Sequence, residues 1–190
     1  MLNEHGISWN TRFTNTICLK DKLWPNDYRI AINFVPLVSD AKKQNLIFEK
    51  YKYCFHRVFQ NSVFIKHDLK AYNTLRSFSN FVIDFVVEPF DQIAGVQIFS
   101  KLNAIGDGLL KVEAMQIESW QGENLQYVIT DESPEWITLQ EMEKTVDNHW
   151  WKNSSPHFSS FQPTKMTWDE IGFTASDEPI LHIIQGGRTK

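Results

Sequence analysis

Asp84 is the residue with the clearest potential for chemistry, because this carboxylate interrupts the apolar run of residues 81–87. On a covered face it must be paired or protonated, and burial then raises its pKa toward the range of a general acid or base. On an alternating strand Asp84 instead points to solvent together with Val82 and Val86. We favour this second placement, and no catalytic residue is predicted.

Tryptophans are the second notable group. The chain has 7 Trp, and those in its second part are Trp120, Trp136, Trp150, Trp151 and Trp168. Tryptophan both fills cores and anchors interfaces, and the core is the commoner place. The alternative is a ligand or partner surface in which Trp120, Trp136, Trp150 and Trp151 act together with His149 and Asp84. Its simplest form is a homodimer through Trp150 and Trp151.

The sequence holds no motif of established chemistry. There is no GxxxxGK(S/T) phosphate loop, no GxGxxG, no HExxH and no GxSxG. His149 and His157 bracket the Trp150-Trp151 pair, and with Asp147 they offer imidazole and carboxylate ligands, but their spacing does not demand a metal. We therefore expect neither a metal nor a cofactor.

A basic stripe is formed by Lys43, Lys50 and Arg57, which are spaced seven apart on an expected helix. Aligned cations of this kind contact phosphates or, more often, form a solvated face. The chain has no aromatic RNA-stacking motif, and its sequence pI is about 5.9. Nucleic acid is therefore an unlikely partner, and binding through the stripe is kept as an alternative.

Composition predicts a globular chain with an uneven charge distribution. Of its 190 residues, 42% are hydrophobic. Residues 1–76 hold 12 Lys or Arg and 6 Asp or Glu, whereas residues 77–190 hold 7 and 17. No apolar run is long enough to span a membrane, the N-terminus does not resemble a signal peptide, and the 2 cysteines form no CxxC pair. We expect a cytoplasmic protein without membrane contact.

Periodicity predicts the elements that would hold these residues. An alternating strand begins at Tyr28, and an amphipathic helix follows from Ala41 to about Gln60 with its N-cap at Ser39-Asp40. The strongest strand, over 81–87, is expected in the centre of the sheet, and a second long helix follows over 90–105. Asp91 lies in the first turn of that helix.

Further strands and a helix are expected after residue 108. A strand over 109–120 changes its apolar parity in the middle, which indicates a β-bulge. Residues 125–130 return as its hairpin partner, and an acidic helix begins at Trp136 and extends to about Asn148. A last strand is expected over 179–184.

These elements predict a single α+β domain over residues 1–190. Two strand–helix–strand units suggest a ferredoxin-like double β-α-β arrangement, with a mixed or antiparallel sheet, two main helices on one face and an extra hairpin. Two strand pairs that flank a helix pair are the alternative topology. The core is expected at about 28–130, with an irregular segment at 1–27 and an acidic, Trp-rich arm at 131–190.

Function is predicted by class only. The leading hypothesis is a non-enzymatic binding protein, such as an immunity-type protein of an accessory genetic element, whose acidic aromatic surface binds a protein partner or a second copy. The alternative is a small-molecule-binding domain or small enzyme with a pocket between the sheet and the arm, lined by Trp120, Trp136 and Trp150.

Overall fold

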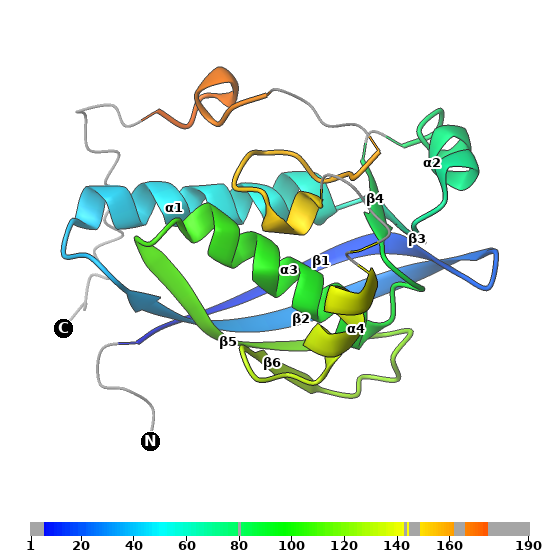
Figure 1. The fold of residues 1–190 in the computed structure, drawn as a ribbon, viewed down its shortest axis with the longest axis horizontal. Helices are drawn as coiled ribbons and strands as arrows, with labels where there is room; N and C mark the ends of the chain where they lie inside the picture. Colours follow the sequence, from blue (N-terminus) through cyan, green and yellow to red (C-terminus); the bar gives the residue numbers. More distant parts are fainter. Residues whose placement is uncertain (1–5, 80, 143, 145–148, 162–165, 175–190) are drawn as a thin grey trace, which may run out of the picture.

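The computed structural model of the protein describes residues 6–79, 81–142, 144, 149–161 and 166–174. They form an α+β fold in which helices lie against a six-stranded mixed sheet (Figure 1). The strands are β1 (Ile7–Leu19), β2 (Lys22–Pro36), β3 (Val63–Lys66), β4 (Val82–Phe85), β5 (Leu110–Ser119) and β6 (Tyr127–Thr130). The α-helices are α1 (Ala41–Tyr53), α2 (Leu69–Leu75), α3 (Asp91–Gly106) and α4 (Glu135–Met142).

The first two strands form a long antiparallel hairpin. This corrects our prediction of an irregular segment over 1–27, of which residues 1–5 lie outside the described part. Phe13 and Ile17 of β1 are buried in the core. Pro25 is tolerated in β2 because β5 pairs with β2 only from Tyr28 onward, so that β2 has a strand on one side only at the proline.

The strand order is β4-β3-β1-β2-β5-β6. Strands β1, β2, β5 and β6 are successively antiparallel, whereas β3 runs parallel to β1 and β4 runs parallel to β3. Helix α1 thus connects β2 to β3, which run in opposite directions, whereas a β-α-β unit connects parallel strands. The strand order therefore differs from the double β-α-β arrangement that we predicted. Our alternative of two strand pairs that flank a helix pair is not found either, because β3, α2 and β4 lie between α1 and α3 in the chain.

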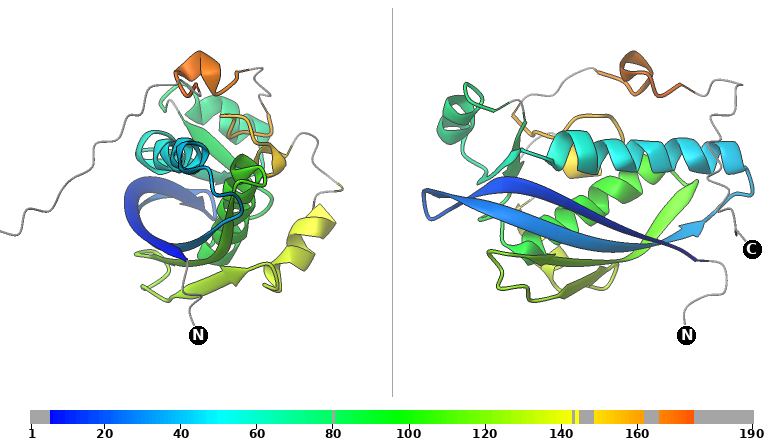
Figure 2. Two further views of the ribbon diagram at one scale, coloured as in Figure 1. Left: turned by 90° about the vertical axis from the view of Figure 1, so that its left-hand side faces the viewer. Right: turned by 180° about the vertical axis from the view of Figure 1, so that it is seen from behind.

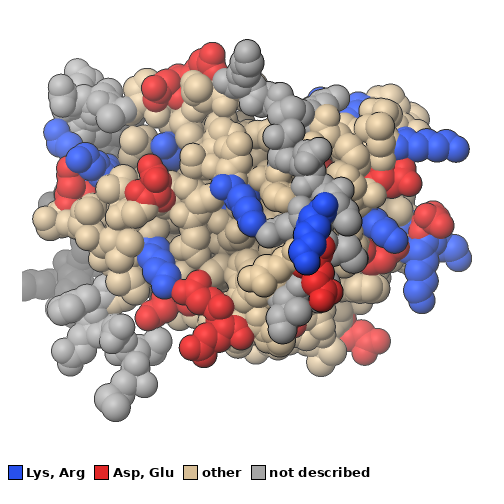
Figure 3. All heavy atoms as spheres, in the orientation of Figure 1, with Lys and Arg blue, Asp and Glu red and all other residues tan. Residues whose placement is uncertain are grey.

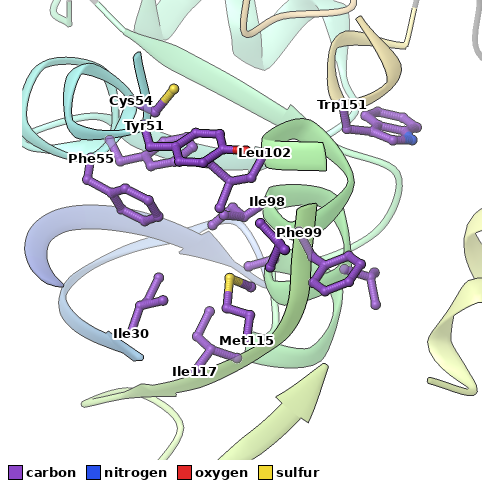
Figure 4. Packing of buried hydrophobic residues seen from close by; sticks show 14 of the residues in the cluster. Ile30, Tyr51, Cys54, Phe55, Ile98, Phe99, Leu102, Met115, Ile117 and Trp151 are labelled. Atoms are coloured by element: carbon purple, nitrogen blue, oxygen red, sulfur yellow. The ribbon is translucent and has the colours of Figure 1, made fainter. Parts of the chain in front are cut away.

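The core lies between these two helices and the concave side of the curved sheet (Figure 2). Tyr51 of α1 points toward Leu102 of α3, and Ile98 of α3 lies between Leu102 and Met115 of β5 (Figure 4). Helix α3 approaches the sheet closely at Gly95, where a Cβ would lie 2.9 Å from Ile129 Cγ1. Glycine at this position therefore allows α3 to pack directly on β5 and β6.

A smaller apolar cluster lies on the opposite face of β3 and β4. Ile65 and Val82 are buried there with Tyr72 of α2, and Phe161 packs against them. Strand β4 is at the edge of the sheet, whereas we predicted a central position. All of its residues are nevertheless buried, because the core covers one face and α2 with Phe161 covers the other.

The start of α1 follows the predicted capping. Asp40 accepts hydrogen bonds from the main-chain N–H of Lys42 at 3.1 Å and of Lys43 at 3.2 Å. The helix ends at Tyr53 and continues as a π-helical segment over Cys54–Phe59, where we predicted one continuous α-helix. A π-helical turn changes the angular spacing of the side chains that follow it.

The predicted β-bulge is found in β5. Asn33 of β2 lies opposite Ala114, while Phe34 lies opposite Val112, so that Glu113 is the extra residue. Because the bulge shifts the alternation by one residue, both Val112 and Met115 face the core.

The described parts of the C-terminal segment pack against α3 and α1. Trp136 of α4 contacts Phe99 of α3, and Trp168 contacts Tyr53 at the end of α1. The strand predicted over 179–184 lies outside the described residues. Within the described ranges, no helix is long and apolar enough to cross a lipid bilayer.

Candidate functional site

Three segments meet at one end of the molecule, which we call the hairpin end: residues 19–25 around the β1–β2 turn, residues 88–92 at the start of α3, and residues 119–127 of the β5–β6 loop (Figure 1). Hydrogen bonds from main-chain N–H groups connect these segments to each other and to the adjoining part of β2. The N–H of Trp120 donates to Asp27 O at 3.1 Å, and the N–H of Lys20 donates to Glu88 Oε2 at 3.4 Å. The backbone of the hairpin end is therefore fixed by contacts between distant parts of the chain.

Large apolar side chains are exposed at the hairpin end: Leu23, Trp24, Phe90, Trp120 and Leu125. Trp120 is 67% exposed and Trp24 is 43% exposed. Single exposed apolar residues are common on protein surfaces, whereas several at one end of a fold are typical of an interaction site.

Asp91 is buried just behind this surface, in the first turn of α3 as the sequence predicted. It is 5% exposed, and its Oδ1 accepts a hydrogen bond from Ser119 Oγ at 2.8 Å. Burial raises the pKa of Asp91, and the hydrogen bond from Ser119 opposes that rise. The second oxygen, Oδ2, has no hydrogen-bond partner among the described residues.

A hollow of about 80 Å³ lies beside Asp91 and opens at the hairpin end. Its lining includes Leu19, Phe90, Gly122 and Tyr127. Glycine is required at position 122 because a Cβ there would collide with Asp91 Oδ2. Asp91 Oδ2 is therefore packed against Gly122 and is closed to solvent.

Further buried polar groups lie near Asp91 on the concave face of the hairpin. Asn15 and Asn26 lie opposite each other in the β1–β2 register and are both buried. Among the described residues, no hydrogen-bond partner is found for either amide atom of Asn15, whereas the Tyr28 hydroxyl lies beside the side-chain amide of Asn26. Burial, and after it the charge of Asp91, raises the pKa of Tyr28. Because buried polar groups are normally hydrogen-bonded, this cluster has unused capacity for water or a ligand.

Acidic residues outnumber basic residues at the hairpin end. The acidic residues are Asp21, Glu88, Asp91 and Glu123, and the basic residues are Lys20 and Lys22. Over the wider face shown in Figure 3, acidic and basic side chains alternate. On that face, the basic first part and the acidic second part of the sequence do not form two separate fields.

Asp84 is fully buried, which corrects our prediction that it points to solvent. Its Oδ2 lies 2.9 Å from His67 Nδ1, and its Oδ1 accepts the N–H of Ser160 at 2.8 Å. The ring of Phe161 stacks on His67, with centroids 4.1 Å apart. A buried carboxylate that orients an imidazole is a component of catalytic triads, but here it also fastens the segment around Ser160 to β3 and β4.

Lys101 of α3 forms a second buried polar centre, which we call the lysine cage. Its side chain is fully buried, and Nζ donates to the main-chain carbonyls of Trp150, Asn153, Ser155 and His157 at 2.6 to 3.0 Å. Burial lowers the pKa of Lys101 to about 7, while the carbonyl oxygens favour its ammonium form. The cage anchors the segment 150–157 to α3.

The predicted tryptophan surface does not assemble. Trp150 and Trp151 are fully buried, so neither can line a surface of the folded monomer. Trp136 is half-buried and donates from Nε1 to Thr130 O at 2.7 Å. His149 packs against Trp151, with ring centroids 4.8 Å apart. Trp150 and Trp151 pack edge-to-face in the core, with ring centroids 5.8 Å apart, so Trp150 does not line an open pocket together with Trp120 and Trp136.

The basic stripe is not a continuous free surface. Lys50 Nζ lies 5.3 Å from the ring centroid of Trp168, and burial lowers its pKa. Lys43 forms an ion pair with Asp40 at 3.6 Å. Arg57 is exposed, but it lies in the π-helical segment. The structure thus leaves the three cations in three different environments.

Sequence reasoning missed His67, Lys101 and the asparagines of the hairpin. A signal existed for Lys101, because it is a cation inside a helix whose other residues are mostly apolar, and such a helix is buried on most sides. Asn15 also stands in an apolar row with Phe13 and Ile17. His67 carries no local signal, because its partner Asp84 comes from another strand.

Neither a protein-family model nor a curated protein sequence matches this chain. Among the described residues, no group of three or more His, Cys, Asp or Glu side chains is placed to hold a metal ion. Function must therefore be inferred from the geometry of the hairpin end.

Proposed function

We propose that the chain is a non-enzymatic, cytoplasmic binding protein that docks a protein partner on the hairpin end. The observation that carries the proposal is the exposure of Trp24 and Trp120 on a backbone held by hydrogen bonds between distant segments. Tryptophan is enriched among residues that dominate binding energy, and a fixed backbone reduces the entropy lost on binding.

The charge of the hairpin end favours a basic partner over a second copy of the chain. A two-fold symmetric contact brings the same patch of both copies together, so that the excess of carboxylates around Glu88 and Glu123 would face itself. The same excess disfavours phosphate backbones, and nucleic acid is the weaker proposal. A basic protein surface with an apolar centre complements the hairpin end in both respects.

The test compares three variants as bait in a pull-down from lysate of the source organism treated with nuclease. Trp24→Ala and Trp120→Ala remove aromatic side chains at the hairpin end. Phe78→Ala is the control, because Phe78 is 83% exposed and lies just after α2, outside the three segments of the hairpin end. We expect one stoichiometric protein to be retained by the wild type and by Phe78→Ala, and to be lost with both Trp variants.

Light scattering of the purified protein separates the two kinds of occupant. A monomeric mass supports a different protein as the partner. A dimeric mass that returns to monomer in Trp24→Ala and Trp120→Ala would assign the hairpin end to a second copy and overturn the heterologous partner. Retention of the same protein by all three variants would overturn the hairpin end itself as the docking site.

A further inference from the structure

We infer that the partner adds an extended, basic segment to the free edge of β6 as a further strand of the sheet. Strand β6 begins at the hairpin end and lies at one edge of the sheet, with β5 as its neighbour on the other side (Figure 1). The inference rests on the proposed function, because it names the form in which the partner binds. It depends on the main chain of β6, whereas the proposed function depends on the exposed tryptophans.

The first argument is the direction of the main-chain groups of β6. In an antiparallel pair, the N–H and C=O of one residue point to the same side, and the side alternates along the strand. The groups of Thr130 point away from β5, because its N–H donates to Ser133 Oγ at 2.9 Å and its C=O accepts from the N–H of Ser133 at 3.2 Å. The N–H and C=O of Val128, two residues earlier, therefore point away from β5 as well.

Strand β5 gives the same direction. The N–H of Trp120 donates to Asp27 O of β2, so by the same alternation Gln116 directs its main-chain groups toward β2. Gln116 lies opposite Val128, and the two residues therefore form a pair without hydrogen bonds between them. The main-chain groups of Val128 thus lie on the outer edge, and this residue is 64% exposed.

The edge is open toward the hairpin end and closed at the other end of the strand. At Thr130, Ser133 and the indole N–H of Trp136 occupy the main-chain groups. At Val128, no hydrogen bond to the outward N–H or C=O is found among the described residues. Exposed edges of this kind bind extended peptides by strand addition, in which main-chain hydrogen bonds supply affinity. The added segment would pair with Val128 and run toward the hairpin end, where Leu125 is 58% exposed.

Charge around the edge favours a basic segment. Residues 112–142, which include β6 and both its flanks, contain no lysine or arginine, and their acidic residues are Glu113, Glu118, Glu123, Asp131, Glu132, Glu135 and Glu141. Glu123 precedes β6 and Glu132 follows it, both are exposed, and no ion pair is found for either among the described residues. Opposite charges on neighbouring strands attract each other, so a strand that carries lysine or arginine complements this edge.

The same charge argues against a second copy of β6 as the added strand. Two antiparallel copies paired around Val128 would bring the flank with Glu123 of one copy beside the flank with Glu132 of the other. Like charges opposite each other destabilise a sheet. A basic segment with apolar residues at alternate positions instead brings cations to both flanks and apolar side chains to Val128.

The experiment uses the full chain and, as the probe, a short peptide of alternating lysine and valine, followed by amide NMR. At a peptide concentration about ten times the Kd, hydrogen exchange of the Val128 amide should slow about tenfold, because the peptide supplies the partner that this N–H lacks. Exchange at Phe78, just after α2, should not change. A peptide of alternating glutamate and valine should not bind. A peptide of alternating lysine and proline should not bind either, because it keeps the charge but cannot form a strand.

Two variants of Val128 separate the contribution of the main chain from that of the side chain. Val128→Pro removes the outward N–H, and an edge strand tolerates proline where the N–H faces away from its neighbour. Val128→Ala is the matched control, because it shortens the side chain and keeps the N–H. We expect Val128→Pro to weaken peptide binding at least about tenfold, and Val128→Ala to stay within about threefold of the wild type. Hydrogen exchange in the wild type decides the question even if Val128→Pro does not fold.

Three results would overturn the inference: unchanged exchange at Val128 in saturating peptide, equal binding to Val128→Pro and Val128→Ala, or equal binding of either control peptide. A dimeric mass that returns to monomer in Val128→Pro would assign the edge to a second copy and also overturn it.

The experiment is separate from the test of the proposed function. A protein that is lost with Trp120→Ala but retained by Val128→Pro would keep the docking surface and remove the added strand. Peptide binding at Val128, without any protein retained through the Trp residues, would keep the edge site and overturn the proposed function.

Discussion

Replacing Lys101 with Met should lower the free energy of unfolding by about 2–4 kcal/mol. The three ammonium N–H groups of Lys101 donate to the carbonyls of the lysine cage. Charge-assisted hydrogen bonds contribute about 1.5–3 kcal/mol each, so the variant loses roughly 5–9 kcal/mol of hydrogen-bond energy. Burial lowers the pKa of Lys101 from 10.5 to about 7, which at about 1.4 kcal/mol per pKa unit corresponds to a cost of about 5 kcal/mol for burying the ammonium. Methionine carries no charge and avoids this cost. The difference is a loss of about 0–4 kcal/mol, and one carbonyl that stays dry in the variant adds about 1–3 kcal/mol, so the middle of these ranges gives an expected loss of about 2–4 kcal/mol.

The assay is urea unfolding followed by tryptophan fluorescence, since Trp150 and Trp151 lie next to the cage and report its packing. Lys111→Met is the control, because Lys111 is half-exposed and forms a surface ion pair with Asp131, whose loss costs at most about 1 kcal/mol. If Lys101→Met were as stable as the wild type, the carbonyls would not depend on the lysine and the cage would not anchor the segment 150–157.

Three further predictions concern stability. Burial lowers the pKa of His157, so below pH about 6.5 the unfolded chain binds a proton that the folded protein lacks. The free energy of unfolding should therefore fall on acidification through that range, and it should fall less steeply in His157→Asn. Urea unfolding at several pH values measures both slopes. Asp84→Asn removes the charged partner of His67 and should cost about 1–3 kcal/mol in the same assay, and a neutral effect would contradict the pairing. Gly95→Ala should lower stability by about 1–3 kcal/mol in thermal unfolding, because the alanine Cβ would press on Ile129, although alanine has the higher helix propensity. A gain in stability would refute that contact.

Local patterns in the sequence predicted local structure well. Asp40 caps α1, Asp91 begins α3, and the parity shift in residues 109–120 marks the bulge at Glu113. Each depends on residues that are close in the sequence. The β1 strand was missed because Asn15 interrupts its row of apolar residues. The topology was misjudged because no local sequence pattern indicates that β1 lies between β2 and β3.

The site was harder to predict because it is built from distant residues. The role of Asp91 as a first-turn carboxylate was visible, but its hollow needs Ser119 and Gly122 from another loop. Trp120 and Trp150 look alike in a sequence, yet one is exposed and the other is buried. Tertiary packing separates them, and composition carries no information about it.

The most direct test of the hairpin end as a partner surface is site-specific photo-crosslinking in cells of the source organism. The photoreactive residue benzoylphenylalanine replaces Leu125, which is 58% exposed at the hairpin end, or Phe78 as the control position. We predict a single crosslinked adduct with another protein from position 125 and none from position 78. Equal adducts from both positions, or an adduct of the chain with itself from position 125, would contradict the proposal that the hairpin end binds a different protein.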